Sequence, residues 1–106
     1  MFEMSPNIAV RHKNYAEAVK FYSDVLGFKN RSSDPDLADF DAASINLFVI
    51  EDDELSGPVM ELFVKDLEAA RDFLVENGCK VLRWRGKGQD CYIQDPFGVI
   101  YNIWEV

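Results

Sequence analysis

Two short stretches place an amide side chain inside an apolar run. They are INLF, residues 45–48, and YNIW, residues 101–104, and their central amides are Asn46 and Asn102. A buried amide must find hydrogen-bond partners, either within the protein or on a bound molecule. Asn7 is a third amide that could satisfy them, so the structural and the ligand-binding interpretations both stay open.

Side chains suited to nucleophilic or metal chemistry are sparse. His12 is the single histidine, and we expect it to be solvated or to cap a helix. Cys79 and Cys91 fall short of a structural zinc set with one histidine, and we expect reduced thiols. No serine lies in a glycine-flanked elbow, so the catalytic residues, if there are any, are unknown.

Composition bounds the class of protein. The chain has 106 residues, 48% of them hydrophobic, which is enough for one compact domain. A net charge of −8 argues against a nucleic-acid partner. We find no apolar run long enough to cross a membrane and no signal peptide in MFEMSPNIAV, so we expect a cytoplasmic protein.

One unit occurs twice along the chain. An offset of 52 aligns VRHKNYAEAVKFYSDVLGF with LFVKDLEAARDFLVENGCKV, and places Asn14 on Asp66. Both are good helix N-caps, and apolar residues at helical spacing follow each of them. Short β-type runs come after each helix, at about 28–32, 39–43, 44–50, 80–85, 90–94 and 99–105.

Each copy therefore has the order β-α-β-β-β, and we predict an α+β fold. We expect a single domain over residues 1–106, with a first unit at 1–50 and a second unit at 59–106. The acidic segment EDDELSGP, residues 51–58, is the expected linker. A unit this small buries little by itself, so the two are expected to pack together.

Strand alternation predicts which side chains face away from the helices. Ile8, Val10, Leu47 and other apolar residues of the same parity are expected to face the helices. The opposite parity leaves amides, one carboxylate, one arginine, one valine and several aromatic rings on the other face. These residues are Asn7, Arg11, Asn46, Phe48, Val59, Glu61, Phe63, Asn102 and Trp104. Tyr92 and Trp84 are further aromatic candidates, whereas Glu51 and Glu105 are expected to point away.

The repeated unit, FYSDVLGF and QDPFGVIYNIWE together resemble the vicinal oxygen chelate superfamily of glyoxalase I, extradiol dioxygenases and bleomycin-binding proteins. The resemblance implies a curved half-barrel sheet with helices on the outside. It also implies metal ligands on the first and last strands of each unit in the metal enzymes. Those positions would be Asn7, Val59, Asn46 and Asn102, so we expect no bound metal and no cofactor.

The leading hypothesis is a metal-free binder of a cationic or aromatic small molecule, as in drug sequestration and antibiotic resistance. The expected ligand-binding residues are Asn7, Arg11, Asn46, Phe48, Glu61, Phe63, Tyr92, Asn102 and Trp104. The alternatives are a metal-dependent lyase or dioxygenase with substituted ligands, and a cofactor-free isomerase using Glu61 as base. The resemblance also implies a homodimer, with the pocket completed within one chain or between chains.

Overall fold

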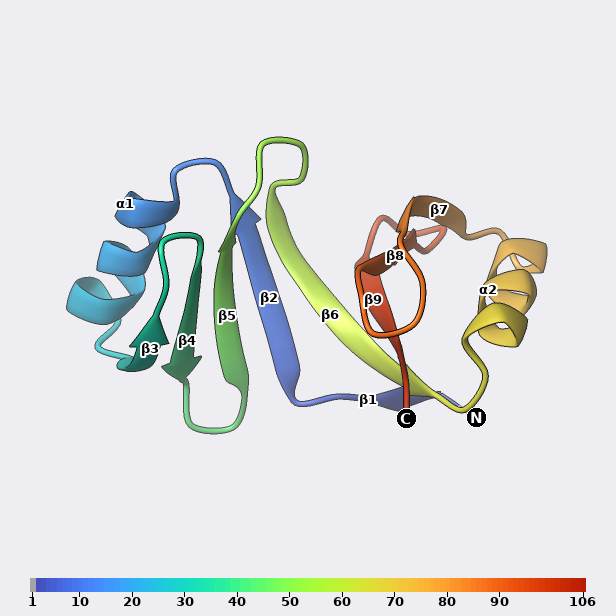
Figure 1. Ribbon diagram of the computed structural model, residues 1–106, viewed down its shortest axis with the longest axis horizontal. Helices are drawn as coiled ribbons and strands as arrows, with labels where there is room; N and C mark the ends of the chain where they lie inside the picture. Colours follow the sequence, from blue (N-terminus) through green and yellow to red (C-terminus); the bar gives the residue numbers. More distant parts are fainter. Residues whose placement is uncertain (1) are drawn as a thin grey trace. The chain divides into compact units, whose positions relative to one another are not determined.

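A computed structural model describes residues 2–106, which divide into two compact halves (Figure 1). The first half comprises residues 6–58, and the second comprises residues 59–106 together with residues 2–5. Among the described residues, no helix has the length and apolar character needed to span a membrane. Each half is an α+β unit with its own sheet, helix and core.

The first half begins with strand β2 (Asn7–His12). Helix α1 (Tyr15–Lys20) follows and continues into the π-helical turn η1 (Phe21–Val25). Three strands complete the half, and they are β3 (Lys29–Ser33), β4 (Leu37–Asp41) and β5 (Asn46–Glu51). Strand β4 pairs with β3 and β5 in antiparallel fashion, and β5 pairs with β2 in parallel. The resulting order is β3-β4-β5-β2.

The second half repeats this order of elements. Strand β6 (Gly57–Val64) leads into helix α2 (Leu67–Glu76), and the strands after it are β7 (Lys80–Trp84), β8 (Cys91–Gln94) and β9 (Ile100–Glu105). Strand β9 pairs in parallel with β6, and β8 pairs antiparallel with both β7 and β9. An additional strand, β1 (Glu3–Met4), pairs with β6 on its other side. The order is β1-β6-β9-β8-β7.

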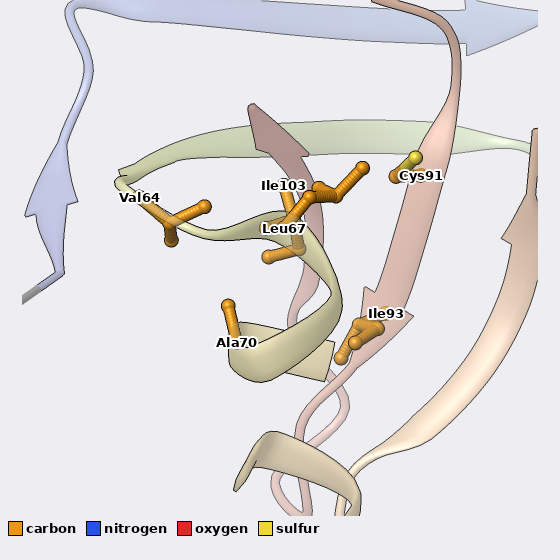
Figure 2. Packing of buried hydrophobic residues seen from close by; sticks show 6 residues of the cluster. All are labelled: Val64, Leu67, Ala70, Cys91, Ile93 and Ile103. Carbon is orange, nitrogen blue, oxygen red and sulfur yellow. The ribbon is translucent and has the colours of Figure 1, made fainter. Parts of the chain in front are cut away.

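Each helix covers one face of its own sheet because its apolar stripe matches the apolar parity of the strands. In the second half, Leu67 and Ala70 of α2 pack on Ile93 and Ile103, as Figure 2 shows. In the first half, Tyr15 packs with the strand residues Ala38, Phe40, Leu47 and Val49. The predicted helix-facing parity is therefore confirmed. We call the opposite face of each sheet its open face.

The helix starts differ in their chemistry. Asp66 caps α2 as predicted, since its carboxylate accepts a hydrogen bond of 3.0 Å from the Ala69 N–H. Asn14 occupies the N-cap position of α1, but its side chain makes no capping bond. Instead its backbone N–H donates to Nδ1 of His12 at 2.9 Å, which agrees with the capping role considered for His12.

Several boundaries differ from the sequence-based expectation. The predicted pair at 39–43 and 44–50 is observed at 37–41 and 46–51, because a turn intervenes in which Ala43 has a φ of 68°. Residues 1–50 were expected to form the first unit, yet residues 2–5 lie with the second half. The half-barrel, which concerns both halves together, stays a prediction.

Candidate functional site

The two amides of the first half bind each other. Asn7 and Asn46 are directly paired between the parallel strands β2 and β5. The Asn46 Nδ2 donates to Oδ1 of Asn7 at 2.9 Å, and Oδ1 of Asn46 accepts from Arg31 at 2.9 Å. Both polar atoms of the Asn46 side chain are thus used within the protein. Hydrogen bonds within the protein therefore satisfy this amide, as the structural interpretation expects.

Arg31 is a member of this cluster that sequence analysis missed. Its Nη2 also donates to Oδ1 of Asp39 at 2.7 Å and to the backbone oxygen of Phe40 at 3.1 Å. The pairing of β3 with β4 shifts register between Asn30 and Ser32, so Arg31 occupies a β-bulge. A bulge breaks the two-residue alternation on which the parity argument depends, and for that reason strand parity could not place Arg31.

The second half has a carboxylate–amide pair at the corresponding place. Glu61 of β6 is paired with Asn102 of β9. The Asn102 Nδ2 donates to Oε2 of Glu61 at 3.3 Å, while its Oδ1 accepts from the backbone N–H of Cys91 at 3.0 Å. The hydroxyl of Ser5, which is only 6% exposed, donates to Oε1 of Glu61 at 2.8 Å. Glu61 is therefore held from two sides.

The register corrects the alignment of the two units. Asn7 pairs with Asn46 in the first half, and Glu61 pairs with Asn102 in the second. The position in the second half that corresponds to Asn7 is thus Glu61 rather than Val59. The offset of 52 was wrong on this strand, because the helices align at one offset and the strands before them at another.

The aromatic candidates separate into accessible and covered rings. Phe63 and Trp104 are paired on β6 and β9, two residues beyond Glu61 and Asn102, and both rings are half-buried on the open face. Phe48 is half-buried on the open face of the first half. Tyr92 is only 2% exposed, with Arg83 lying 5.5 Å from its ring centroid, so it offers little ring surface to a ligand.

Trp84 lies on the helix side of its sheet. Its ring packs against the core beneath α2, and the guanidinium of Arg71, a residue of that helix, lies 5.3 Å from the ring centroid. The suggestion that Trp84 contributes to an open-face pocket was wrong. The bulge between Val81 and Arg83 on β7 explains the error, since it changes the parity within that strand.

Charged residues at the strand ends are committed to other contacts. The side chain of Arg11 is 9% exposed and forms an ion pair with Asp52 at 3.4 Å, so at least part of its role is structural. Glu105 accepts a hydrogen bond of 3.0 Å from the Leu67 N–H at the start of α2. This contact confirms that Glu105 points to the helix side, as strand parity predicted.

Both cysteines are free thiols, as expected. Cys91 is fully buried, and its thiol donates to the backbone oxygen of Gly86 at 3.2 Å. Burial, together with the nearby negative charge of Asp95, raises the pKa of the half-buried Cys79 thiol. The environment of Cys79 therefore does not favour the thiolate form that a nucleophile requires.

A cavity of about 360 Å³ lies on the helix side of the second half rather than on its open face. Two stacked phenyl rings, Phe2 and Phe73, border it, with their centroids 6.2 Å apart. Its other lining residues are Val64, Lys65, Asp66, Ala69 and Ala70. The N-terminal residues and α2 create this space, and the residues expected to bind a ligand do not line it.

The donor atoms at the family's metal positions do not fit a transition metal. In the first half, Asn7 and Asn46 provide two neutral amides that bind each other. In the second half, the carboxylate of Glu61 stands beside an amide, and both of its oxygens accept hydrogen bonds. Transition metals are held by imidazole, thiolate or carboxylate. Within residues 2–106, no three His, Cys, Asp or Glu side chains gather closely enough to hold an ion.

The comparisons with known proteins agree with the sequence motifs. A sequence model of the Glyoxalase/Bleomycin resistance protein/Dioxygenase superfamily matches residues 6–103. The chain therefore belongs to this superfamily. No curated protein sequence matches it significantly.

Several solved structures are similar to this chain in fold. A superfamily member from Vibrio splendidus aligns over 100% of both chains with a TM-score of 0.64 and 15% identity. A hypothetical protein from Bacillus halodurans aligns over 99% of this chain and 94% of its own, with a TM-score of 0.66 and 17% identity.

A homoprotocatechuate 2,3-dioxygenase from Brevibacterium fuscum, in complex with 3,4-dihydroxyphenylacetate, has a TM-score of 0.61 and 20% identity. The alignment covers 94% of this chain but only 35% of the dioxygenase chain. At these identities, all three likenesses establish the fold alone.

Proposed function

We propose that this protein is a small-molecule-binding member of the superfamily that holds a flat aromatic compound without a metal ion. One observation carries the proposal: Phe63 and Trp104 lie side by side on the open face of the second half, next to the Glu61–Asn102 pair. Paired residues on these neighbouring strands lie on the same face of the sheet, and the strands are about 4.8 Å apart. Two rings beside fixed polar groups are typical of ligand sites.

The polar pair supports recognition of one end of the ligand. Asn102 is fixed by its bonds to Glu61 and to the backbone of Cys91, so the pair needs no reorganisation when a ligand arrives. A cationic ligand is the favoured case, because a cation gains from contact with aromatic faces and from the net charge of −8.

Isothermal titration calorimetry with two ring systems of matched shape tests this proposal. Proflavine is a flat cation, and acridone is flat and neutral. We expect both to bind and proflavine to bind more tightly. Trp104→Ala should weaken binding at least about tenfold, whereas Phe97→Ala, which removes an 89% exposed ring on the turn before β9, should change it less than about twofold.

Two results would count against the aromatic site. One is the absence of measurable heat with either compound at millimolar concentration. The other is binding that survives Trp104→Ala unchanged, which would place the ligand elsewhere. Stronger binding of acridone than of proflavine would retain the site but remove the preference for cations.

A second candidate function is supported by the fixed geometry of Glu61. Its carboxylate is held between the Ser5 hydroxyl and the Asn102 amide, as a positioned general base is in an enzyme. In a cofactor-free isomerase it would remove a proton next to a carbonyl group. Exchange of such protons for deuterium, followed by NMR over a panel of carbonyl compounds, tests this; Glu61→Gln should abolish any exchange that the wild-type protein catalyses.

We also propose that the protein is a homodimer, as the family resemblance implies. Size-exclusion chromatography with light scattering measures the mass directly. A mass of about twice the 12.1 kDa of one chain supports the dimer, and a mass equal to one chain at micromolar concentration refutes it.

A further inference from the structure

The bulged residue Arg31 has an orientation that its neighbours fix firmly. Three acceptors, on Asp39, Phe40 and Asn46, all take their hydrogen bonds from the same nitrogen, Nη2. The guanidinium thereby reaches from β3 across β4 to β5. A long side chain anchored in this way has already lost most of the rotamer freedom that ligand binding would otherwise cost.

The other nitrogens of the Arg31 guanidinium are available. Arginine carries five N–H donors, of which Nη2 supplies two. Within residues 2–106, the N–H of Nε and the two of Nη1 have no hydrogen-bond partner, and the side chain is 38% exposed. Because Nη2 is anchored, the guanidinium presents its three remaining N–H donors, on Nε and Nη1, to solvent.

Two further donors lie on the same strand and the same face. Lys29 and Ser32 are paired with Asp41 and Asp39, which are open-face positions of β4. Although Lys29 lies opposite Asp41, it forms no ion pair in the described part of the chain, and the Ser32 hydroxyl makes no hydrogen bond there. Strand β3 thus exposes two cations and a hydroxyl together.

The nearby carboxylates limit the strength of such a site without occupying its donors. Asp39 engages only Nη2 of Arg31, and Oδ1 of Asp41 accepts from the Ala43 N–H. The charges of Lys29, Arg31, Asp39 and Asp41 sum to about zero, in a chain whose net charge is −8. Any anion held here depends on directed hydrogen bonds more than on long-range attraction.

We propose that the open face of β3 is an oxyanion site, at which Arg31, Ser32 and Lys29 hold a carboxylate or a phosphate group of a small molecule. It lies in the first half and does not depend on the aromatic site of the second. With few ligand atoms in contact, the dissociation constant for a simple oxyanion should be on the order of 1–10 mM.

NMR of the arginine Nε–Hε signals tests the site directly in the wild-type protein. Acetate and inorganic phosphate are titrated separately at constant, low ionic strength, so that the two chemistries are distinguished. We expect saturable shifts at the Arg31 Nε–Hε and the Ser32 amide. Arg85 is also exposed and forms no ion pair in the described residues, so it serves as the matched control and should shift weakly and linearly.

Two variants complete the test. Arg31→Gln should weaken binding at least about fivefold, whereas Arg85→Gln should change it less than about twofold. The proposal is overturned if the Arg31 signal does not saturate with either anion, if Arg85 responds equally, or if Arg31→Gln binds as the wild type does. Failure of the aromatic titrations would leave this result unaffected, because acetate and phosphate carry no ring.

Discussion

Replacing Asn102 with aspartate tests whether the amide at this family position is needed as a hydrogen-bond donor. The substitution keeps the size of the side chain and the oxygen that accepts from Cys91. It removes the N–H that donates to Glu61 and places a second carboxylate at the 3.3 Å separation of the two groups. The variant then has two carboxylates in contact, where the wild-type protein has one carboxylate and one neutral amide.

The structure sets the size of the effect. At 3.3 Å, two unit charges repel by about 5 kcal/mol in an effective dielectric of 20, and by about 1.3 kcal/mol in bulk water. Both residues are only half-buried, so solvent screening brings the repulsion toward the lower figure. Adding about 1 kcal/mol for the lost hydrogen bond, we expect Asn102→Asp to lose about 2 kcal/mol, or about 10 °C in melting temperature, at pH 7.

The pH dependence separates repulsion from simple loss of packing. One proton bound between the two carboxyls removes the repulsion, and the folded variant binds that proton more tightly than its unfolded chain does. The deficit should therefore be full above about pH 6 and shrink as the pH falls toward about 4. Thermal melts followed by circular dichroism, in buffers with a chelator, measure this.

Asn30→Asp is the matched control, because it adds the same charge at an exposed site on β3. We expect it to change stability by less than about 0.5 kcal/mol at every pH. If Asn102→Asp proves as stable as the wild type at pH 7, or if its deficit does not depend on pH, the assigned contact between Asn102 and Glu61 is wrong.

Three further predictions concern the cap, a turn and a thiol. Asp66→Ala should destabilise the protein by about 1 kcal/mol in chemical unfolding, whereas Asn14→Ala should cost less than about half of that, since only Asp66 makes a side-chain cap. Burial alone would raise the pKa of Asp95, but the N–H groups of Val99 and Phe97 and the Tyr101 hydroxyl lower it. These bonds stabilise the folded protein at pH values above the unperturbed pKa of an aspartate, and their contribution is lost as the pH falls through the lowered pKa of Asp95. Asp95→Asn should therefore reduce the dependence of the unfolding free energy on pH at acidic pH. The raised pKa of Cys79 predicts that iodoacetamide alkylates it more slowly at pH 8 than it alkylates a cysteine in an unfolded peptide. Cys91 is fully buried and should react only after unfolding. Fast labelling of both cysteines in the native protein would contradict this.

Sequence patterns predicted the regular parts of the fold well. The apolar alternation of strands such as INLFVI and the helical spacing after Asp66 depend on local periodicity, which the buried faces of each half preserve. The helix side of both sheets was predicted for that reason. The mutual bond of Asn7 and Asn46, considered from sequence, is also present.

The remaining features depend on information that periodicity does not contain. The bulges at Arg31 and near Leu82 change side-chain direction without any glycine or proline to mark them. The pairing of β1 with β6 brings Ser5 to Glu61 from 56 residues away, and no local pattern specifies that contact. Register likewise identified Glu61, and not Val59, as the partner position of Asn102.

The metal content of the purified protein tests the central claim most directly. The protein would be incubated with Ni²⁺, Zn²⁺, Mn²⁺ and Fe²⁺ in turn, desalted and measured by elemental mass spectrometry, alongside Asn46→Ala, Asn102→Ala and Glu61→Gln. Because the amides bind protein groups, we predict less than about 0.1 equivalents of each metal in every sample. Close to one equivalent in the wild type, lost in any of these variants, would contradict the account.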